Sequence, residues 1–144
     1  MFSKACEYGI RAVLFITLKS LNKERTRLKE IAKEIKAPEA FTAKVLQKLV
    51  KQGIIQSSTG PKGGFYIEYE RIDEIKLMQV VRAIDGDWIL NGCGLGLPRC
   101  NEDHPCPVHH RFKDIKADLI NMLTTMSVHE MAVDVNKGLA FLRY

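Results

Sequence analysis

Residues 28–53 decide the fold, and they contain the sequence LKEIAKEIKAPEAFTAKVLQKLVKQG. Over residues 28–35 apolar side chains recur at three- and four-residue steps, which predicts an amphipathic helix of about two turns. Pro38 interrupts this pattern and is well placed at the start of a new helix. We expect the second helix to end at Gly53, because glycine is common just beyond a helix C-terminus. Two short helices joined by a tight turn are typical of a helix-turn-helix.

The second helix carries two kinds of residue. Its large apolar positions predict an inner face of Phe41, Val45, Leu46, Leu49 and Val50. Its outer face is expected to enter the major groove of DNA, which is about as wide as a helix. The base-facing candidates are Thr42, Ala43 and Gln47, and the candidates nearer to the phosphates are Lys44 and Lys48.

A β-hairpin is predicted directly after this helix. Two short strand-like runs, 54–58 and 65–69, are joined by Thr59-Gly60-Pro61-Lys62-Gly63-Gly64. Glycines and a proline between such runs are typical of a hairpin turn. In this position the hairpin is the expected wing of a winged helix-turn-helix. Lys62 at its tip, among glycines that permit close approach, is a candidate contact to the DNA backbone.

Two more helices are predicted on either side of this unit. Residues 3–21 are apolar around most of the helix circumference, with Ser3 as N-cap, so this helix is expected to be buried on several sides. Cys6 within it is expected to be a small buried hydrophobic residue. A second apolar repeat covers residues 75–84 and is closed by Asp85-Gly86.

A long helix is predicted from Val108 to about Met126. Its apolar stripe consists of Phe112, Ile115, Leu119, Met122, Leu123 and Met126. Such a stripe forms either a core face or a seam with a partner helix. Because it is too long to be covered by so small a core, we expect a homodimer. Ser127 and Glu130 fit a capping box that starts a final helix.

These patterns together predict a mainly α fold with a small β-hairpin. The expected organisation is a winged helix-turn-helix domain over residues 1–86, a cysteine-rich loop over 87–107 and dimerisation helices over 108–144. Charged residues interrupt every apolar run, so neither an export signal nor a membrane span is expected. We therefore expect a cytoplasmic protein.

Positive charge is concentrated in the first half of the chain. Residues 1–69 contain 13 Lys and Arg and 6 Asp and Glu, whereas residues 70–144 contain 9 and 11, so the two parts carry +7 and −2. A basic module suits a polyanion, because neutralising phosphates releases condensed counterions. Double-stranded DNA is therefore the expected partner, and no enzymatic role is indicated.

Three cysteines and a histidine form a candidate metal site. Cys93, Cys100 and Cys106 are separated by six and five residues, and His109 follows three positions later. Three thiolates and one imidazole can fill four ligand positions of an iron–sulfur cluster or of zinc. Structural zinc sites favour tighter Cys-x-x-Cys pairs, so this spacing favours an iron–sulfur cluster over zinc. The alternative without a metal is that these cysteines are ordinary thiols in a surface loop.

Three sequence blocks resemble a known family of bacterial regulators. They are Glu7-Tyr8-Gly9-Ile10-Arg11-Ala12, Gly60-Pro61-Lys62-Gly63-Gly64-Phe65 and residues 80–86. They are similar to blocks of the winged helix-turn-helix family that includes the iron–sulfur cluster regulator IscR, the nitric-oxide-sensitive repressor NsrR and the cysteine-metabolism repressor CymR. The resemblance implies that the long helix pairs two subunits. Family wings often place an arginine where this chain has Thr59, which implies a different DNA contact at that position.

The resemblance also bears on the metal site. IscR-like members carry three cysteines and a histidine in this arrangement, with a first interval one residue shorter, and bind a two-iron, two-sulfur cluster. NsrR-like members take a carboxylate at the position of Glu7 from the opposite subunit, so Glu7 is the alternative fourth ligand to His109. A four-iron, four-sulfur cluster or zinc also remains open.

A regulator that senses iron–sulfur status, oxidants or nitric oxide is the function expected from these features. A redox or electron-transfer protein is the alternative from another class, although it leaves the basic half and the wing unexplained. A third possibility keeps DNA binding and uses a thiol reaction or a partner protein as the signal. CymR-like members lack the cysteine triad, so its presence here argues against that possibility.

Overall fold

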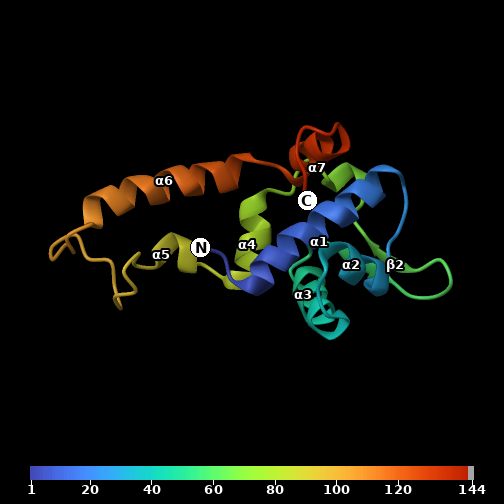
Figure 1. The fold of residues 1–144 in the computed structure, drawn as a ribbon, viewed down its shortest axis with the longest axis horizontal. Helices are drawn as coiled ribbons and strands as arrows, with labels where there is room; N and C mark the ends of the chain where they lie inside the picture. Colours follow the sequence, from blue (N-terminus) through green and yellow to red (C-terminus); the bar gives the residue numbers. More distant parts are fainter. Residues whose placement is uncertain (143–144) are drawn as a thin grey trace.

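A computed structural model of the protein describes residues 1–142, so the last two residues of the predicted segment 108–144 lie outside it. Its elements are α1 (Lys4–Leu21), α2 (Leu28–Ile35), α3 (Glu39–Lys51), β1 (Gln56–Ser58), β2 (Gly64–Tyr66), the 3-10 turn η1 (Tyr69–Arg71), α4 (Leu77–Asp85), α5 (Trp88–Asn91), α6 (His109–Thr125) and α7 (Val128–Asn136). The predicted mainly α fold with a small antiparallel hairpin is confirmed (Figure 1).

Two helix starts are fixed by the capping groups that the sequence predicts. The Ser3 hydroxyl accepts a hydrogen bond from the Cys6 N–H at 3.1 Å and begins α1. At α7 the Ser127 hydroxyl accepts from the Glu130 N–H at 3.1 Å, while the Ser127 N–H donates to Glu130 Oε2 at 2.8 Å. Each cap satisfies backbone donors that the first helical turn leaves without a partner.

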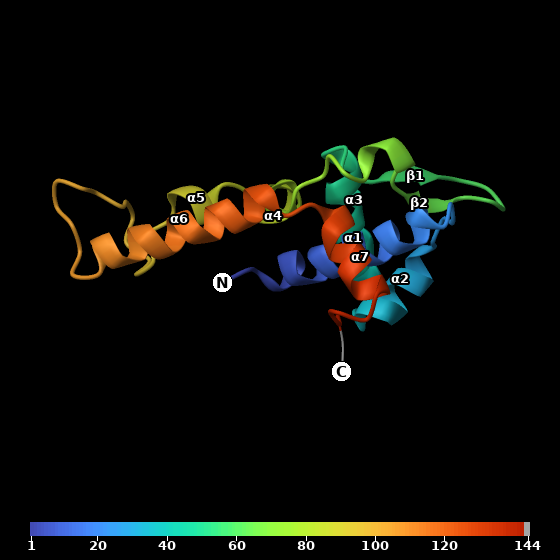
Figure 2. The same cartoon turned by 90° about the horizontal axis from the view of Figure 1, so that it is seen from above.

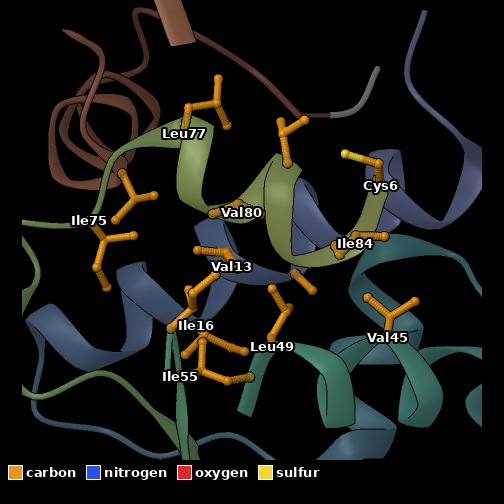
Figure 3. Packing of buried hydrophobic residues seen from close by; sticks show 14 of the residues in the cluster. Cys6, Val13, Ile16, Val45, Leu49, Ile55, Ile75, Leu77, Val80 and Ile84 are labelled. Atoms are coloured by element: carbon orange, nitrogen blue, oxygen red, sulfur yellow. The ribbon is translucent and has the colours of Figure 1, made fainter. Parts of the chain in front are cut away.

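The core is built around α1, which packs against α2, α3, α4 and α7. Figure 3 shows side chains of α1, α3 and α4 meeting in one cluster, with Val13 and Ile16 of α1 beside Leu49 of α3 and Val80 of α4. Cys6 is fully buried in this cluster, as predicted. The all-round apolar character of residues 3–21 therefore reflects a helix covered on most sides.

The inner face of α3 agrees with the sequence prediction at Val45, Leu46 and Leu49 but differs in its first turn. Its buried residues are Thr42, Val45, Leu46 and Leu49. Thr42, expected to face DNA, is completely buried, and its hydroxyl donates to the Pro38 carbonyl at 2.9 Å. Phe41, expected inside, is exposed and packs edge-on against Tyr8 with ring centroids 5.6 Å apart. In the first turn of α3, a small hydroxyl-bearing side chain bonded to a nearby carbonyl therefore faces the core in place of the expected Phe41.

The hairpin pairs β1 with β2 in antiparallel register, with Ser57 opposite Phe65. A third segment adds to it, because the Thr26 N–H donates to the Phe65 carbonyl at 3.1 Å and the Phe65 N–H donates to the Thr26 carbonyl at 2.7 Å. We call residues 56–66 the wing. The chain just before α2 therefore runs along the wing.

Helix α6 projects away from the rest of the molecule (Figures 1 and 2). Residues 92–108, which we call the cysteine loop, lie at its far end, and α5 runs along it. The wing lies at the opposite end of the molecule in both views. At the base of α6, Leu123 is fully buried, and the Leu77 N–H of α4 donates to the Met126 carbonyl at 3.0 Å.

The final helix returns to the body of the protein. Helix α7 packs against α1, and Val128 belongs to the core cluster. Within residues 108–142, α6 therefore extends outward while α7 helps to cover α1. In the part of the chain that the structure describes, no helix is long and apolar enough to cross a membrane.

Because Thr42 is buried and hydrogen-bonded, it should contribute to the stability of the fold. We expect Thr42→Ala to lower the free energy of unfolding by about 1–2 kcal/mol, since it removes a buried methyl and a hydrogen-bonded hydroxyl. The exposed neighbour gives the control, because Lys44→Ala should change stability by less than about 0.5 kcal/mol. Urea denaturation followed by circular dichroism measures both. Equal effects of the two substitutions would contradict the observed orientation of α3.

Candidate functional site

A cavity of about 400 Å³ lies between α5, the cysteine loop and the outer part of α6. All four metal ligands favoured from the sequence line it: Cys93, Cys100, Cys106 and His109. Its remaining walls include apolar side chains such as Leu90, Phe112 and Ile120. Residues spread over 17 positions, from the cysteine loop to the first residue of α6, therefore share one partly apolar cavity.

Two of the four side chains lie close together, because Cys100 Sγ lies 3.3 Å from His109 Nδ1. Among the described residues, no three His, Cys, Asp or Glu side chains converge closely enough to hold a single metal ion. The structure thus gathers the predicted donors around a common space without drawing them onto one point.

Backbone groups favour the thiolate form of Cys93. Hydrogen bonds from the backbone of Leu95 and Leu97 hold the pKa of this thiol below its ordinary value, and Cys106 and the Lys116 ammonium act in the same direction. A thiolate is the form of cysteine that binds metals. The turn after Cys93 closes through the Gly96 N–H, which donates to the Cys93 carbonyl at 2.9 Å.

His109 is the first residue of α6 and is only 5% exposed. Its backbone N–H donates to the Cys106 carbonyl at 3.0 Å, so the helix start holds the two predicted ligands together. Its Nε2 atom is shielded from solvent and has no hydrogen-bond partner in the described structure. A buried polar atom without a partner costs free energy unless it binds something, so this imidazole is suited to a ligand role.

Two lysines of α6 tie the loop to the helix. Lys116 Nζ donates to the Leu90 carbonyl at 3.1 Å and to the Gly92 carbonyl at 2.7 Å, and Lys113 pairs with Glu102. Neither lysine is among the site residues predicted from the sequence. Both fall outside the apolar stripe, so only the path of the loop reveals their contacts.

Glu7, the alternative fourth ligand, does not line the cavity of its own chain. It lies on α1 and pairs with Lys4 at 2.8 Å, a contact that lowers the pKa of its carboxyl. Its suggested role requires the opposite subunit, so it stays a prediction.

The candidate nucleic-acid surface combines α3 with the wing. Lys44, Gln47 and Lys48 are exposed on α3, and Ala43 beside them is half-buried. Thr59 and Lys62 are exposed at the tip of the wing. Thr42 alone among the sequence candidates is turned into the core.

Comparisons with known proteins agree with this architecture. A putative HTH-type transcriptional regulator of Aquifex aeolicus (strain VF5) is 30% identical over 134 residues, which cover 91% of this chain and 90% of that protein. The HTH-type transcriptional regulator IscR of Aliivibrio salmonicida (strain LFI1238) is 25% identical over 127 residues, covering 88% of this chain and 74% of that protein.

Solved structures show the same fold. CymR, the global cysteine regulator of B. subtilis, has a TM-score of 0.73 at 19% identity, covering 92% of this chain and 96% of that one. The T. potens IscR structure has a TM-score of 0.73 at 18% identity, covering 98% of this chain and 92% of that one.

A family comparison covers most of the chain. Residues 2–134 match Rrf2, described as "Iron-dependent Transcriptional regulator". The predicted resemblance is thereby confirmed, and the relatives are transcription regulators rather than enzymes. The chain belongs to the Rrf2 family of transcriptional regulators.

Proposed function

We propose that this DNA-binding transcription regulator responds to the state of an iron–sulfur cluster, a two-iron, two-sulfur cluster, held by Cys93, Cys100, Cys106 and His109. The observation that carries this proposal is the common cavity that all four side chains line. We place its action in the cytoplasm, where the DNA lies and where thiols stay reduced.

The residues present fit such a group. Three thiols and one imidazole supply four donors, and cysteine with histidine at some positions is a known ligand set for iron–sulfur clusters. The shielded, unpartnered Nε2 of His109 supports a ligand role for the imidazole. The four donors line one common space, and no three metal-binding side chains of the described residues converge on one point, which favours a group larger than one ion. When bound, a cluster would supply a centre that reacts with oxidants or nitric oxide.

A homodimer is the second part of the proposal. We infer that two copies pair along α6, because much of its apolar stripe is uncovered in the single chain. Phe112 is 39% exposed, Ile115 62% and Met122 40%. Apolar side chains gathered on one face of a projecting helix mark an interaction surface. A C2 dimer would cover this face with its own copy.

A continuous set of packed elements links the cavity to the DNA-binding surface. The base of α6 is joined to α4 through the Lys76 ammonium, which donates to the Thr125 carbonyl at 3.2 Å. Helix α4 in turn packs against α1 and α3. This connection supports a role for the cavity in regulation rather than in electron transfer, which would leave the winged helix-turn-helix unused.

For the cluster, anaerobic reconstitution of His109→Ala should remove most of the visible absorbance and of the bound iron and sulfide, because one of four ligands is lost. Glu7→Ala is the matched control and should keep all three. If His109→Ala kept the absorbance, iron and sulfide of the wild type and Glu7→Ala lost them, the fourth ligand would be Glu7 instead. If the protein bound stoichiometric zinc and no sulfide, the site would be a zinc site and not a cluster site.

Dimerisation along α6 can be tested with charge placed on the stripe. Ile115→Glu should halve the mass measured by light scattering at low micromolar concentration, because a buried unpaired carboxylate is costly. Asn121→Glu puts the same charge on another exposed face of α6 and should stay dimeric. A wild-type protein that is monomeric at this concentration would contradict the inferred dimer.

On the DNA-binding surface, we assign Gln47 and Ala43 to base contacts, and Lys44, Lys48, Thr59 and Lys62 to the backbone or the neighbouring groove. Gln47→Ala should change which sequence is preferred, because base contacts carry specificity. Lys48→Ala and Lys62→Ala should lower the affinity for all DNA sequences alike and reduce the dependence of that affinity on salt concentration. Fluorescence anisotropy with a selected duplex and its point mutants measures this. Unchanged relative affinities for Gln47→Ala would show that another residue reads the bases.

A further inference from the structure

The segment before α2 forms a third, outer edge of the wing. Thr26 exchanges two backbone hydrogen bonds with Phe65, at 3.1 Å and 2.7 Å. Gly64 is required beside this contact, because a Cβ on it would lie 2.8 Å from the Thr26 carbonyl oxygen. Residues 25–27 are therefore held against the wing by backbone contacts.

Strand alternation places two arginines on the outside of this segment. Successive side chains of an extended chain point to opposite faces. The Thr26 side chain is fully buried, and Arg25 and Arg27 on either side of it are exposed. Both guanidinium groups therefore lie on the solvent face of the wing.

Contacts with the wing hold both side chains in place. The Arg25 guanidinium lies 4.2 Å from the centroid of the Tyr66 ring and donates to the Ser58 hydroxyl at 2.7 Å. Arg27 Nη2 donates to the Gly60 carbonyl at 3.1 Å and to the Pro61 carbonyl at 2.8 Å. A guanidinium has five N–H donors, so each arginine keeps donors available for another partner.

Positive charge dominates around these arginines. Lys23, Arg25, Arg27 and Lys62 line one shallow depression beside the tip of the wing, together with Glu30. Glu30 is turned to the backbone, where its Oε2 accepts from the Arg27 N–H at 3.3 Å and from the Thr26 hydroxyl at 3.1 Å. Glu24 pairs with Lys19 at 3.4 Å. Other glutamates lie in neighbouring depressions, Glu68 and Glu70 beside Arg25 and Glu39 beside Arg27.

We propose that Arg25 and Arg27 form, with Lys62, a phosphate-binding face on the wing that grips the backbone of double-stranded DNA. Planar guanidinium groups match phosphate oxygens better than ammonium groups do. The inference rests on the DNA-binding function of the protein and extends its contact surface to a segment outside the helix-turn-helix.

The test uses the full-length protein and a 30-base-pair duplex that the wild-type protein selects from a random pool. Arg25→Gln and Arg27→Gln should each lower affinity by roughly three- to tenfold and reduce the slope of log K against log salt by about 0.9. Arg25→Lys and Arg27→Lys should restore the slope, since they restore the charge. Lys137→Gln, which removes one charge beyond α7, is the matched control and should leave both quantities unchanged.

The proposal would be overturned if Arg25→Gln and Arg27→Gln both kept the wild-type slope of log K against log salt while Lys48→Ala reduced it. DNA binding itself would then stand. A slope that stays reduced in the lysine variants would also overturn the proposal, because the arginines would then act only by shaping the wing. Failure of the wild-type protein to select any duplex would instead contradict the DNA-binding function itself. Thermal unfolding of each variant shows whether the wing mutants stay folded.

Discussion

The close approach of α1 to α4 at Gly9 is the constraint on which the rest of the structure depends. A Cβ at this position would lie 2.0 Å from Ile84 Cδ1 and 3.3 Å from Val45 Cγ1. Three helices therefore meet where α1 has no side chain, and even a methyl group would force Ile84 to turn away. One of these helices, α3, belongs to the helix-turn-helix, and another, α4, leads directly into α5 and the cysteine loop. The three helices therefore pack closely around this residue.

The residues around Gly9 extend this junction to both helices of the helix-turn-helix. Tyr8 packs edge-on against Phe41 of α3, and the Arg11 guanidinium lies 4.9 Å from the centroid of the Tyr8 ring. Arg11 also donates to the Ile35 carbonyl at the end of α2, at 3.4 Å. The sequence block that carries the family resemblance is thus a structural joint. It orients the DNA-binding helices without belonging to the proposed base-reading surface.

Local signals in the sequence predict most of the fold. The bounds of α2, the caps at Ser3 and Ser127 and the hairpin after α3 all follow from contacts within a few residues. The first turn of α3 does not, because Phe41 and Thr42 both fit a 3.6-residue repeat and tertiary packing decides which of them faces the core. The position of Arg25 and Arg27 on the wing depends on a bridge to Phe65 far along the chain. The four predicted donors share a cavity, but the close approach of Cys100 to His109 depends on how the loop folds over α6.

The projection of α6 has a mechanical consequence. Its 17 residues span about 25 Å at 1.5 Å per residue, and its inner end is anchored by Leu123 and by the bond to Leu77. Any change in the direction of α6 would therefore pivot about its fulcrum, the contact with α4. A rotation of about 5° at the fulcrum would move the outer end by about 2 Å over that length. Conversely, a displacement of about 2 Å in the cysteine loop would reach the core as a rotation of α6 by only about 5°.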